Sequence, residues 1–106
     1  MTSATIGIGS LGTIGSRVAQ AIVQDPNLGS LQVVSARDHE RAAQKLRDLG
    51  SDAKVVKMAD LAMADIVIEC APALIFREIA MPAIQQGKTL IPASVAGLLA
   101  NPDIIA

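Results

Sequence analysis

The amino-acid sequence predicts one α/β domain built on a doubly wound parallel sheet, on three grounds. First, strand-like and helix-like hydrophobic patterns alternate along the 106 residues. Second, 51% of the residues are apolar, yet the chain has one Phe and no Trp or Tyr. The core must therefore be built from Ile, Val, Leu and Ala, which is typical of strands buried on both faces. Third, the turns that follow the strand-like runs would all meet at one edge of a parallel sheet, where such folds bind ligands.

The first unit is a strand, a glycine-rich turn and a helix. Ile6 and Ile8 alternate as in a buried strand over Thr5–Ile8, and apolar residues at helical spacing predict a helix over Thr13–Gln24. Glycines let a backbone approach a pyrophosphate closely, and the N-terminus of a helix offers free N–H groups to the anion. The unit predicts a dinucleotide-binding turn, although a tight turn that binds nothing has a similar local pattern.

Two registers fit the glycine motif. Gly7, Gly9 and Gly12 match it literally, but this register shortens the strand and leaves Gly15 inside the helix. There a glycine destabilises the helix by about 1 kcal/mol relative to alanine. The other register uses Ser10, Gly12 and Gly15, so that Gly15 lies in the first helical turn and packs closely on the strand. We favour the second register, which requires a serine in place of the first glycine.

The second unit is a short strand over Leu31–Ser35 and a helix over His39–Leu49, which Gly50 ends. Arg37 follows the strand about 20 residues after the glycine motif, where a basic residue can meet the 2′-phosphate of NADP. A solvated arginine is the plain alternative. For Asp38 we favour an N-cap of the helix over a contact with the ribose.

The rest of the chain continues the alternation, and Asn101 with Pro102 is typical of a helix start, which indicates a chain cut from a longer one. Pro82 predicts a kink in the last helix. The expected elements are an edge strand over Ala53–Lys57, a short helical turn over Asp60–Ala64, a buried strand over Ile66–Cys70, a helix over Ala73–Gln86 and a strand over Thr89–Ile91.

Reactive side chains are few in this sequence. We expect Glu69 to be a structural carboxylate, Cys70 a small core residue and His39 an exposed residue. The sequence offers no metal-ligand cluster and no Ser/His/Asp set, so we assign it no catalytic and no metal-binding residue.

The charge balance excludes several classes of partner. Nine Lys and Arg stand against ten Asp and Glu, so no basic stripe predicts a nucleic acid. No apolar run approaches the roughly 18 residues of a transmembrane helix. The N-terminus lacks the basic opening of a secretory signal, and one cysteine suits a reducing compartment, so we expect a cytoplasmic protein.

Three stretches resemble the cofactor domain of L-aspartate dehydrogenases: Ile8–Val18, Ile68–Ala71 and Ser94–Asp103. More distantly the chain is similar to the Rossmann-like nucleotide domains of homoserine dehydrogenase, dihydrodipicolinate reductase and the glucose–fructose oxidoreductase group. The resemblance covers nearly the whole chain. It implies hydride transfer between NAD or NADP and an amino acid, with iminoaspartate as the oxidised product. The family's catalytic histidine and substrate residues belong to a later domain, through which a homo-oligomer can form.

The resemblance and the strand-end turns together give one set of cofactor-binding residues. The family pattern assigns the pyrophosphate to the glycine turn, the nicotinamide ribose to Ala71 and Pro72, and the ring to Ser94 and Val95. Ala36 stands where many relatives carry the ribose-binding acid, so we expect NADP to bind at least as well as NAD. The expected residues are Gly9, Ser10, Leu11, Gly12, Thr13, Ile14, Ala36, Arg37, Asp38, Cys70, Ala71, Pro72, Ser94 and Val95.

Three other functions remain open from sequence. One is a non-catalytic module that senses NAD(P) and regulates an attached partner. Another is an enzyme of the homoserine dehydrogenase or dihydrodipicolinate reductase type, and the third is a doubly wound domain that binds no nucleotide.

Overall fold

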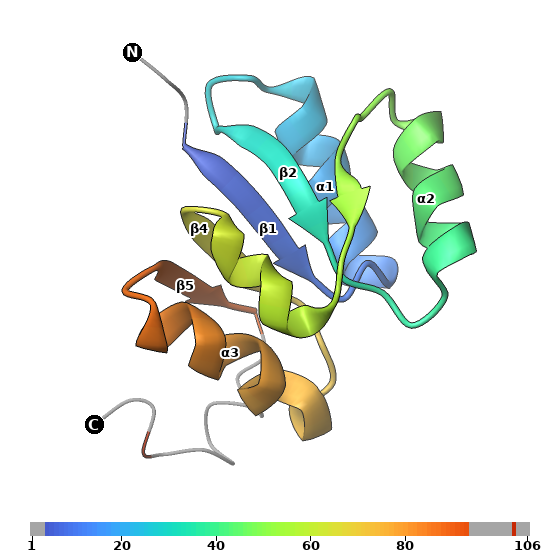
Figure 1. Cartoon of the computed structure of the whole chain (residues 1–106). Helices are drawn as coiled ribbons and strands as arrows, with labels where there is room; N and C mark the ends of the chain where they lie inside the picture. The colour runs from blue at the N-terminus through green and yellow to red at the C-terminus, as the bar shows by residue number, and fades with distance from the viewer. Residues whose placement is uncertain (1–3, 94–102, 104–106) are drawn as a thin grey trace.

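The computed structural model describes residues 4–93 and 103, and its centre is a five-stranded parallel sheet in the order β3-β2-β1-β4-β5. The chain alternates strands with helices, as the hydrophobic patterns predict (Figure 1). The elements are β1 (Thr5–Gly9), α1 (Thr13–Gln24), β2 (Ser30–Val34), α2 (His39–Asp48), β3 (Lys54–Val55), the 3₁₀ helix η1 (Met58–Met63), β4 (Ile66–Glu69), the 3₁₀ helix η2 (Ala73–Ile75), α3 (Phe76–Gln85) and β5 (Thr89–Pro92).

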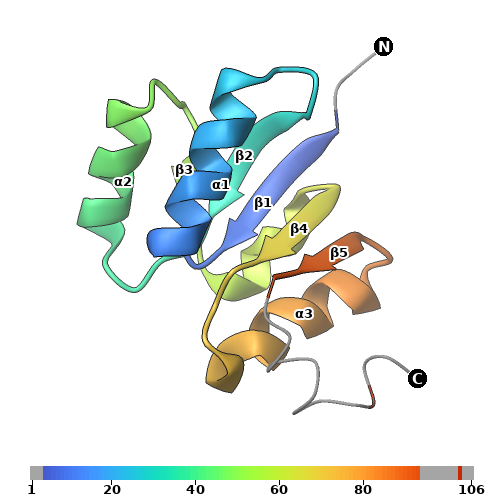
Figure 2. The ribbon, with the colours of Figure 1, turned by 180° about the vertical axis from the view of Figure 1, so that it is seen from behind.

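Helices cover both faces of the sheet, which confirms the doubly wound prediction. Seen from behind, α1 lies across β1 and β2, and α2 lies beside β3 (Figure 2). On the opposite face η1 and α3 pack against each other, with η1 over β1 and α3 over β4 and β5 (Figure 1). The order β3-β2-β1-β4 reverses direction at β1, so the carboxyl end of β1 is the switch point at which such sheets bind ligands.

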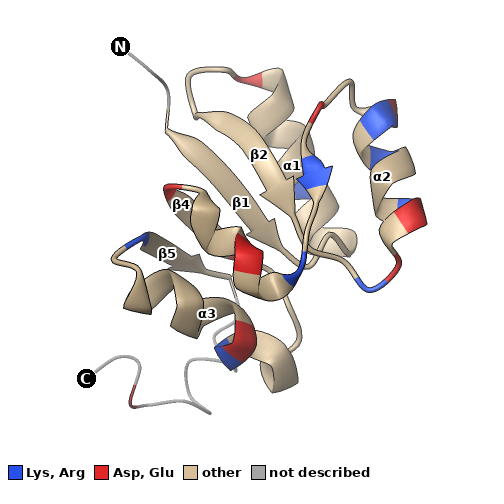
Figure 3. Cartoon of the chain, in the orientation of Figure 1, with Lys and Arg blue, Asp and Glu red and all other residues tan. Residues whose placement is uncertain are grey.

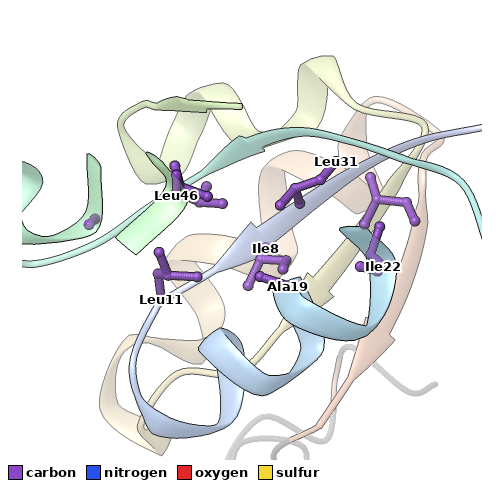
Figure 4. Close-up of a cluster of buried hydrophobic side chains, with 9 residues drawn as sticks. Ile8, Leu11, Ala19, Ile22, Leu31 and Leu46 are labelled. Carbon is purple, nitrogen blue, oxygen red and sulfur yellow. The ribbon is translucent and has the colours of Figure 1, made fainter. Parts of the chain in front are cut away.

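Two apolar clusters form the core, one on each face. The cluster under α1 and α2 joins Ile6 and Ile8 of β1 to residues of both helices, and Figure 4 shows these side chains converging between sheet and helices. The cluster under η1 and α3 includes Leu61, Val67 and Ile79. Branched aliphatic side chains build both clusters, as the composition predicts.

Glycines on the other face of β1 let η1 and α3 approach the strand. A Cβ on Gly7 would lie 3.2 Å from the Leu61 carbonyl oxygen, and one on Gly9 would lie 2.8 Å from Ile79 side-chain carbons. Both residues are therefore strand residues with a packing role. This argues for the register built on Ser10, Gly12 and Gly15.

A β-bulge in β2 changes which side chains face α1. Ile6 pairs with Leu31 and Gly7 with Val33, so Gln32 is the extra residue in β2. As a result Leu31 and Val34 point into the cluster under α1 and α2, whereas Val33 joins the opposite cluster. Both valines are therefore buried, one on each face of the sheet.

Most predicted boundaries agree with the structure to within two residues, and α1 has the predicted bounds. The exception is the single helix expected over Ala73–Gln86, which is wrong in its first turn. There η2 forms first, with the Ile75 N–H donating to the Pro72 carbonyl, and Ile75 then leaves the helical region at φ −109° and ψ 5°. This break turns the chain so that α3 begins at Phe76, whose side chain is fully buried.

None of the helices in the described part of the chain is long and apolar enough to cross a membrane.

Thr5 and Asp65 join the start of β1 to the start of β4. The Thr5 N–H donates to Asp65 Oδ2 at 3.1 Å, and the Asp65 N–H donates to Thr5 Oγ1 at 2.9 Å. Hydrogen bonds from Thr5, first from its backbone N–H and then from its side chain, hold the pKa of Asp65 below its ordinary value, and the charge of Lys88 lowers it further. The ionised carboxylate is thus favoured in the folded state.

This pairing predicts a pH dependence of stability. Because folding lowers the pKa of Asp65, its contribution is present above the unfolded value of about 3.9 and is lost as the pH falls through the lower folded value. We expect Asp65→Asn to lower the free energy of unfolding at pH 7 and to flatten its decline in acid. Urea unfolding at pH 7 and pH 3 measures both effects, with Asp52→Asn as a charge-matched control. Parallel acid profiles for Asp65→Asn and the wild type would contradict the assignment.

Candidate functional site

A cavity of about 470 Å³ opens at the carboxyl ends of β1 and β2, between the β1–α1 turn and α2. It joins two turns that lie about 25 residues apart in sequence, as expected at a switch point. The lining residues are Ser10, Leu11, Gly12, Thr13, Ala36, Arg37, Asp38, Arg41, Ala42 and Lys45.

Ser35, the first residue after β2, holds the β1–α1 turn in place. Its hydroxyl accepts from the Ser10 N–H at 3.0 Å and its carbonyl from the Leu11 N–H at 2.9 Å. The Ser35 N–H donates in turn to the Ile8 carbonyl at 2.9 Å. Ser35 is buried, so its polar groups satisfy the turn rather than a ligand. Sequence analysis did not assign this role, and a serine ending an otherwise apolar strand was the available signal.

Ser10 takes the backbone conformation that the motif reserves for glycine. Its φ is +75°, in the left-handed region, and no other described non-glycine residue has a positive φ. Such a conformation costs an L-residue roughly 1–2 kcal/mol. The Ser35 hydroxyl bonded to the Ser10 N–H offsets part of that cost, so the turn stays tight without the glycine.

Gly12 and Gly15 differ in what surrounds them. Gly12 is the N-cap of α1 and makes no side-chain cap, and a Cβ there would have nothing within 4 Å. A Cβ on Gly15 would collide with the Ser10 carbonyl oxygen. Gly12 therefore faces open space in front of the helix N-terminus, whereas Gly15 packs the helix onto the turn. These are the placements expected of the second and third glycines of the motif.

The β2–α2 loop forms the other wall of the cavity. Asp38 caps α2, with its Oδ1 accepting from the Arg41 N–H at 3.1 Å, which confirms the favoured prediction. Arg37 is exposed and lines the cavity. Arg41 and Lys45 also line it, although the sequence analysis did not include them. Their spacing of four residues places them on one face of α2, and only the packing of α2 beside α1 turns that face to the cavity.

The carboxyl end of β4 carries Glu69 and Cys70. Glu69 is fully buried, and its Oε2 accepts from the Ala71 N–H at 2.9 Å, so it shapes the turn after β4 as a structural carboxylate. Burial raises the pKa of the Cys70 thiol, and the charge of Glu69 raises it further. The thiol is therefore protonated near neutral pH, which disfavours a nucleophilic role.

The structure brings together seven of the expected cofactor residues around the cavity and leaves five outside its lining. Gly9, Ile14, Cys70, Ala71 and Pro72 are those five. Gly9 and Cys70 are nevertheless adjacent, since the Cys70 N–H donates to the Gly9 carbonyl at 2.9 Å. Ser94 and Val95 lie outside the described residues.

His39 is exposed, as predicted, and lines a separate hollow on the other side of α2. Within residues 4–93 and 103, no three His, Cys, Asp or Glu side chains gather as metal ligands would.

The placement of Gly15 predicts an unusual response to alanine. In an open helical position Gly→Ala stabilises by about 1 kcal/mol. At Gly15 we expect a loss of about 2 kcal/mol, because the added methyl group must displace the Ser10 carbonyl. Gly12→Ala, whose methyl group meets open space, should cost less than about 1 kcal/mol. Thermal unfolding of both variants measures the difference, and a stabilised Gly15→Ala would contradict this packing.

Comparisons with known proteins identify relatives of this chain and agree with its fold. The chain is 38% identical over 101 residues to an L-aspartate dehydrogenase of Bradyrhizobium diazoefficiens, covering 94% of this chain and 36% of that protein. It is 35% identical to L-aspartate dehydrogenase 3 of Bordetella bronchiseptica, covering 93% of this chain and 37% of that protein. The chain thus spans little more than a third of the length of these curated relatives.

Solved structures share the fold. A probable dehydrogenase from Thermotoga maritima superposes with a TM-score of 0.80 at 21% identity, covering 93% of this chain and 31% of that one. In sequence, residues 10–104 match the profile described as the NAD binding domain of homoserine dehydrogenase. The chain belongs to this family of NAD-binding domains.

Proposed function

We propose that this chain is the cofactor-binding part of a dehydrogenase that transfers a hydride between NAD or NADP and L-aspartate. The family match supports the cofactor, and the two L-aspartate dehydrogenase relatives support the substrate. The family profile is named for homoserine dehydrogenase, so homoserine is the second substrate to test. A sensing module has no comparable support among the relatives.

The open space at Gly12 carries the cofactor proposal. Because Gly12 has no side chain, the backbone of the β1–α1 turn is open to a ligand there. The first N–H groups of α1 also have no partner within the helix. No acidic residue lies in the first turn of α1 to repel an anion. A dinucleotide pyrophosphate therefore suits this surface, with Ser10 to Ile14 as its cradle.

The remaining expected residues receive roles along the same edge. Ala36, Arg37 and Asp38 would lie beside the adenine ribose, and Gly9 and Cys70 would form the floor between the two halves of the cofactor. Ala71 and Pro72 would border the nicotinamide ribose, and Ser94 and Val95 would adjoin the ring. The bound nicotinamide supplies the hydride acceptor or donor, while this chain binds and orients it.

We expect the residues that bind the substrate to lie in the part of the relatives that this chain does not span. Neither Glu69, which is buried and structural, nor the exposed His39 is suited to proton transfer at the cofactor edge. We further propose a cytoplasmic enzyme that assembles as a homo-oligomer through its substrate domain. A single cysteine is in keeping with a reducing compartment.

Gly12→Val tests the cradle. The added isopropyl group would occupy the space assigned to the pyrophosphate, so we expect NADH and NADPH to bind at least tenfold more weakly, about 1.4 kcal/mol. The fold should persist, because that space is open. Calorimetric titration measures affinity and circular dichroism checks folding, with Ala59→Val in η1 as a control that places the same isopropyl side chain at an exposed position elsewhere. Unchanged affinity in Gly12→Val would reject this cradle.

The division between cofactor and substrate parts gives a second expectation. The chain of 106 residues should bind reduced cofactor yet catalyse no reduction of NAD or NADP with aspartate or homoserine. Fluorescence of reduced nicotinamide follows binding, and its absorbance follows turnover. The product of the complete gene should turn over one of the two amino acids, which identifies the substrate. Turnover by the 106-residue chain itself would overturn the division.

A further inference from the structure

Three cationic side chains border the adenine-side wall of the cavity. Arg37 precedes α2, and Arg41 and Lys45 follow at intervals of four residues along it. Figure 3 shows blue segments in the loop before α2 and along that helix. Residues four apart lie on one helical face, so Arg41 and Lys45 present their charges to the same space that Arg37 borders.

The cavity is more basic than the protein as a whole. The chain has a net charge of −1, yet three cations and one carboxylate, that of Asp38, line this cavity. Asp38 already accepts the Arg41 N–H as the cap of α2. Glu40 and Arg47, which also belong to α2, line the hollow on its other side.

None of the three cations is neutralised within the described residues. The ion pair found in residues 4–93 and 103 joins Arg77 to Asp103, away from α2. Lys45 is half-buried, and its Nζ donates to Ser16 Oγ of α1 at 3.4 Å, a long contact that directs the ammonium between the two helices. The cations are therefore available to an anion that enters the cavity.

We propose that Arg41 and Lys45, together with Arg37, form a phosphomonoester subsite that selects a dinucleotide with a 2′-phosphate on its adenine ribose. This inference rests on the proposed cofactor function and names residues that determine its specificity. A phosphomonoester carries about −1.5 to −2 charges at pH 7, whereas NAD has a neutral hydroxyl at this position. Planar guanidinium groups bind phosphate with two parallel hydrogen bonds, and an ammonium adds a compact charge.

The same wall disfavours the recognition used for NAD. An acid at the end of β2 would accept the ribose hydroxyls, but Ala36 stands there and the Asp38 carboxylate caps α2. The wall thus lacks a carboxylate dedicated to accepting hydrogen bonds from the ribose hydroxyls. It holds three side chains that can donate hydrogen bonds to a phosphate.

The test compares affinities of the full 106-residue chain for NADPH, NADH, 2′,5′-ADP and 5′-AMP by calorimetry. The variants are Arg41→Met and Lys45→Met, with Arg37→Ala as a third. Arg47→Met is the matched control, because it removes a cation from the same helix on the opposite side. Lys45→Arg keeps the charge and guards against a merely structural effect of changing a half-buried residue.

We expect each of the three charge-removing variants to bind NADPH and 2′,5′-ADP about tenfold more weakly, as loss of a charge-assisted hydrogen bond does. Their affinities for NADH and 5′-AMP should change less than about twofold. Arg47→Met and Lys45→Arg should retain the wild-type ratio of NADPH to NADH affinity. The losses should shrink at high salt.

The outcomes separate this inference from the function on which it rests. If the wild-type chain binds NADH, but the variants lose affinity for NADH and NADPH equally or for neither, the subsite is rejected. The proposed cofactor function then still stands. Wild-type chain that binds neither dinucleotide overturns the cofactor function and the subsite with it. If Arg47→Met loses as much NADPH affinity as Lys45→Met, the effect is due to net charge alone and the subsite is rejected.

Discussion

The hydrogen bonds of Ser35 fix the one turn on which the rest of the site depends. By accepting from the Ser10 and Leu11 N–H groups, Ser35 holds Ser10 in its left-handed conformation at the end of β1. That conformation sets where α1 starts, so Gly15 can press against the Ser10 carbonyl and Gly12 can face open space. A buried hydroxyl just after the neighbouring strand therefore stabilises this turn where the literal motif has a glycine.

Under the proposed function, the cavity divides cofactor recognition between two kinds of surface. Around Gly12 it is backbone and helix N-terminus, which can receive a pyrophosphate of any dinucleotide. Along α2 it consists of long cationic side chains, whose effect depends on what the ribose carries. The first surface is fixed by the sheet and the packing of α1, and the second can vary in sequence with little effect on the core. Cofactor choice can therefore change in this fold without altering its β1–α1 turn.

Much of the architecture follows from the sequence because local pattern and fold agree. The α1 bounds and the Asp38 cap are local features, and hydrophobic period or capping chemistry fixes each of them. Other features depend on distant partners. The bulge at Gln32 is defined only by the pairing of β2 with β1, and the basic face of α2 borders a cavity only because α2 lies beside α1. The interruption at Ile75 likewise depends on burying Phe76.

The central position of β1 sets the order in which this sheet can assemble. Its pairing with β2 closes a loop of about 25 residues around α1, whereas its pairing with β4, which the Thr5–Asp65 hydrogen bonds secure, joins residues 60 apart. Closing the longer loop costs more chain entropy before any contact repays it. We therefore expect the β1–α1–β2 unit to form early in the folding transition state and β4 to dock afterwards. The proposed dinucleotide cradle then belongs to the folding nucleus, so we expect substitutions in it to alter folding rates as well as cofactor affinity.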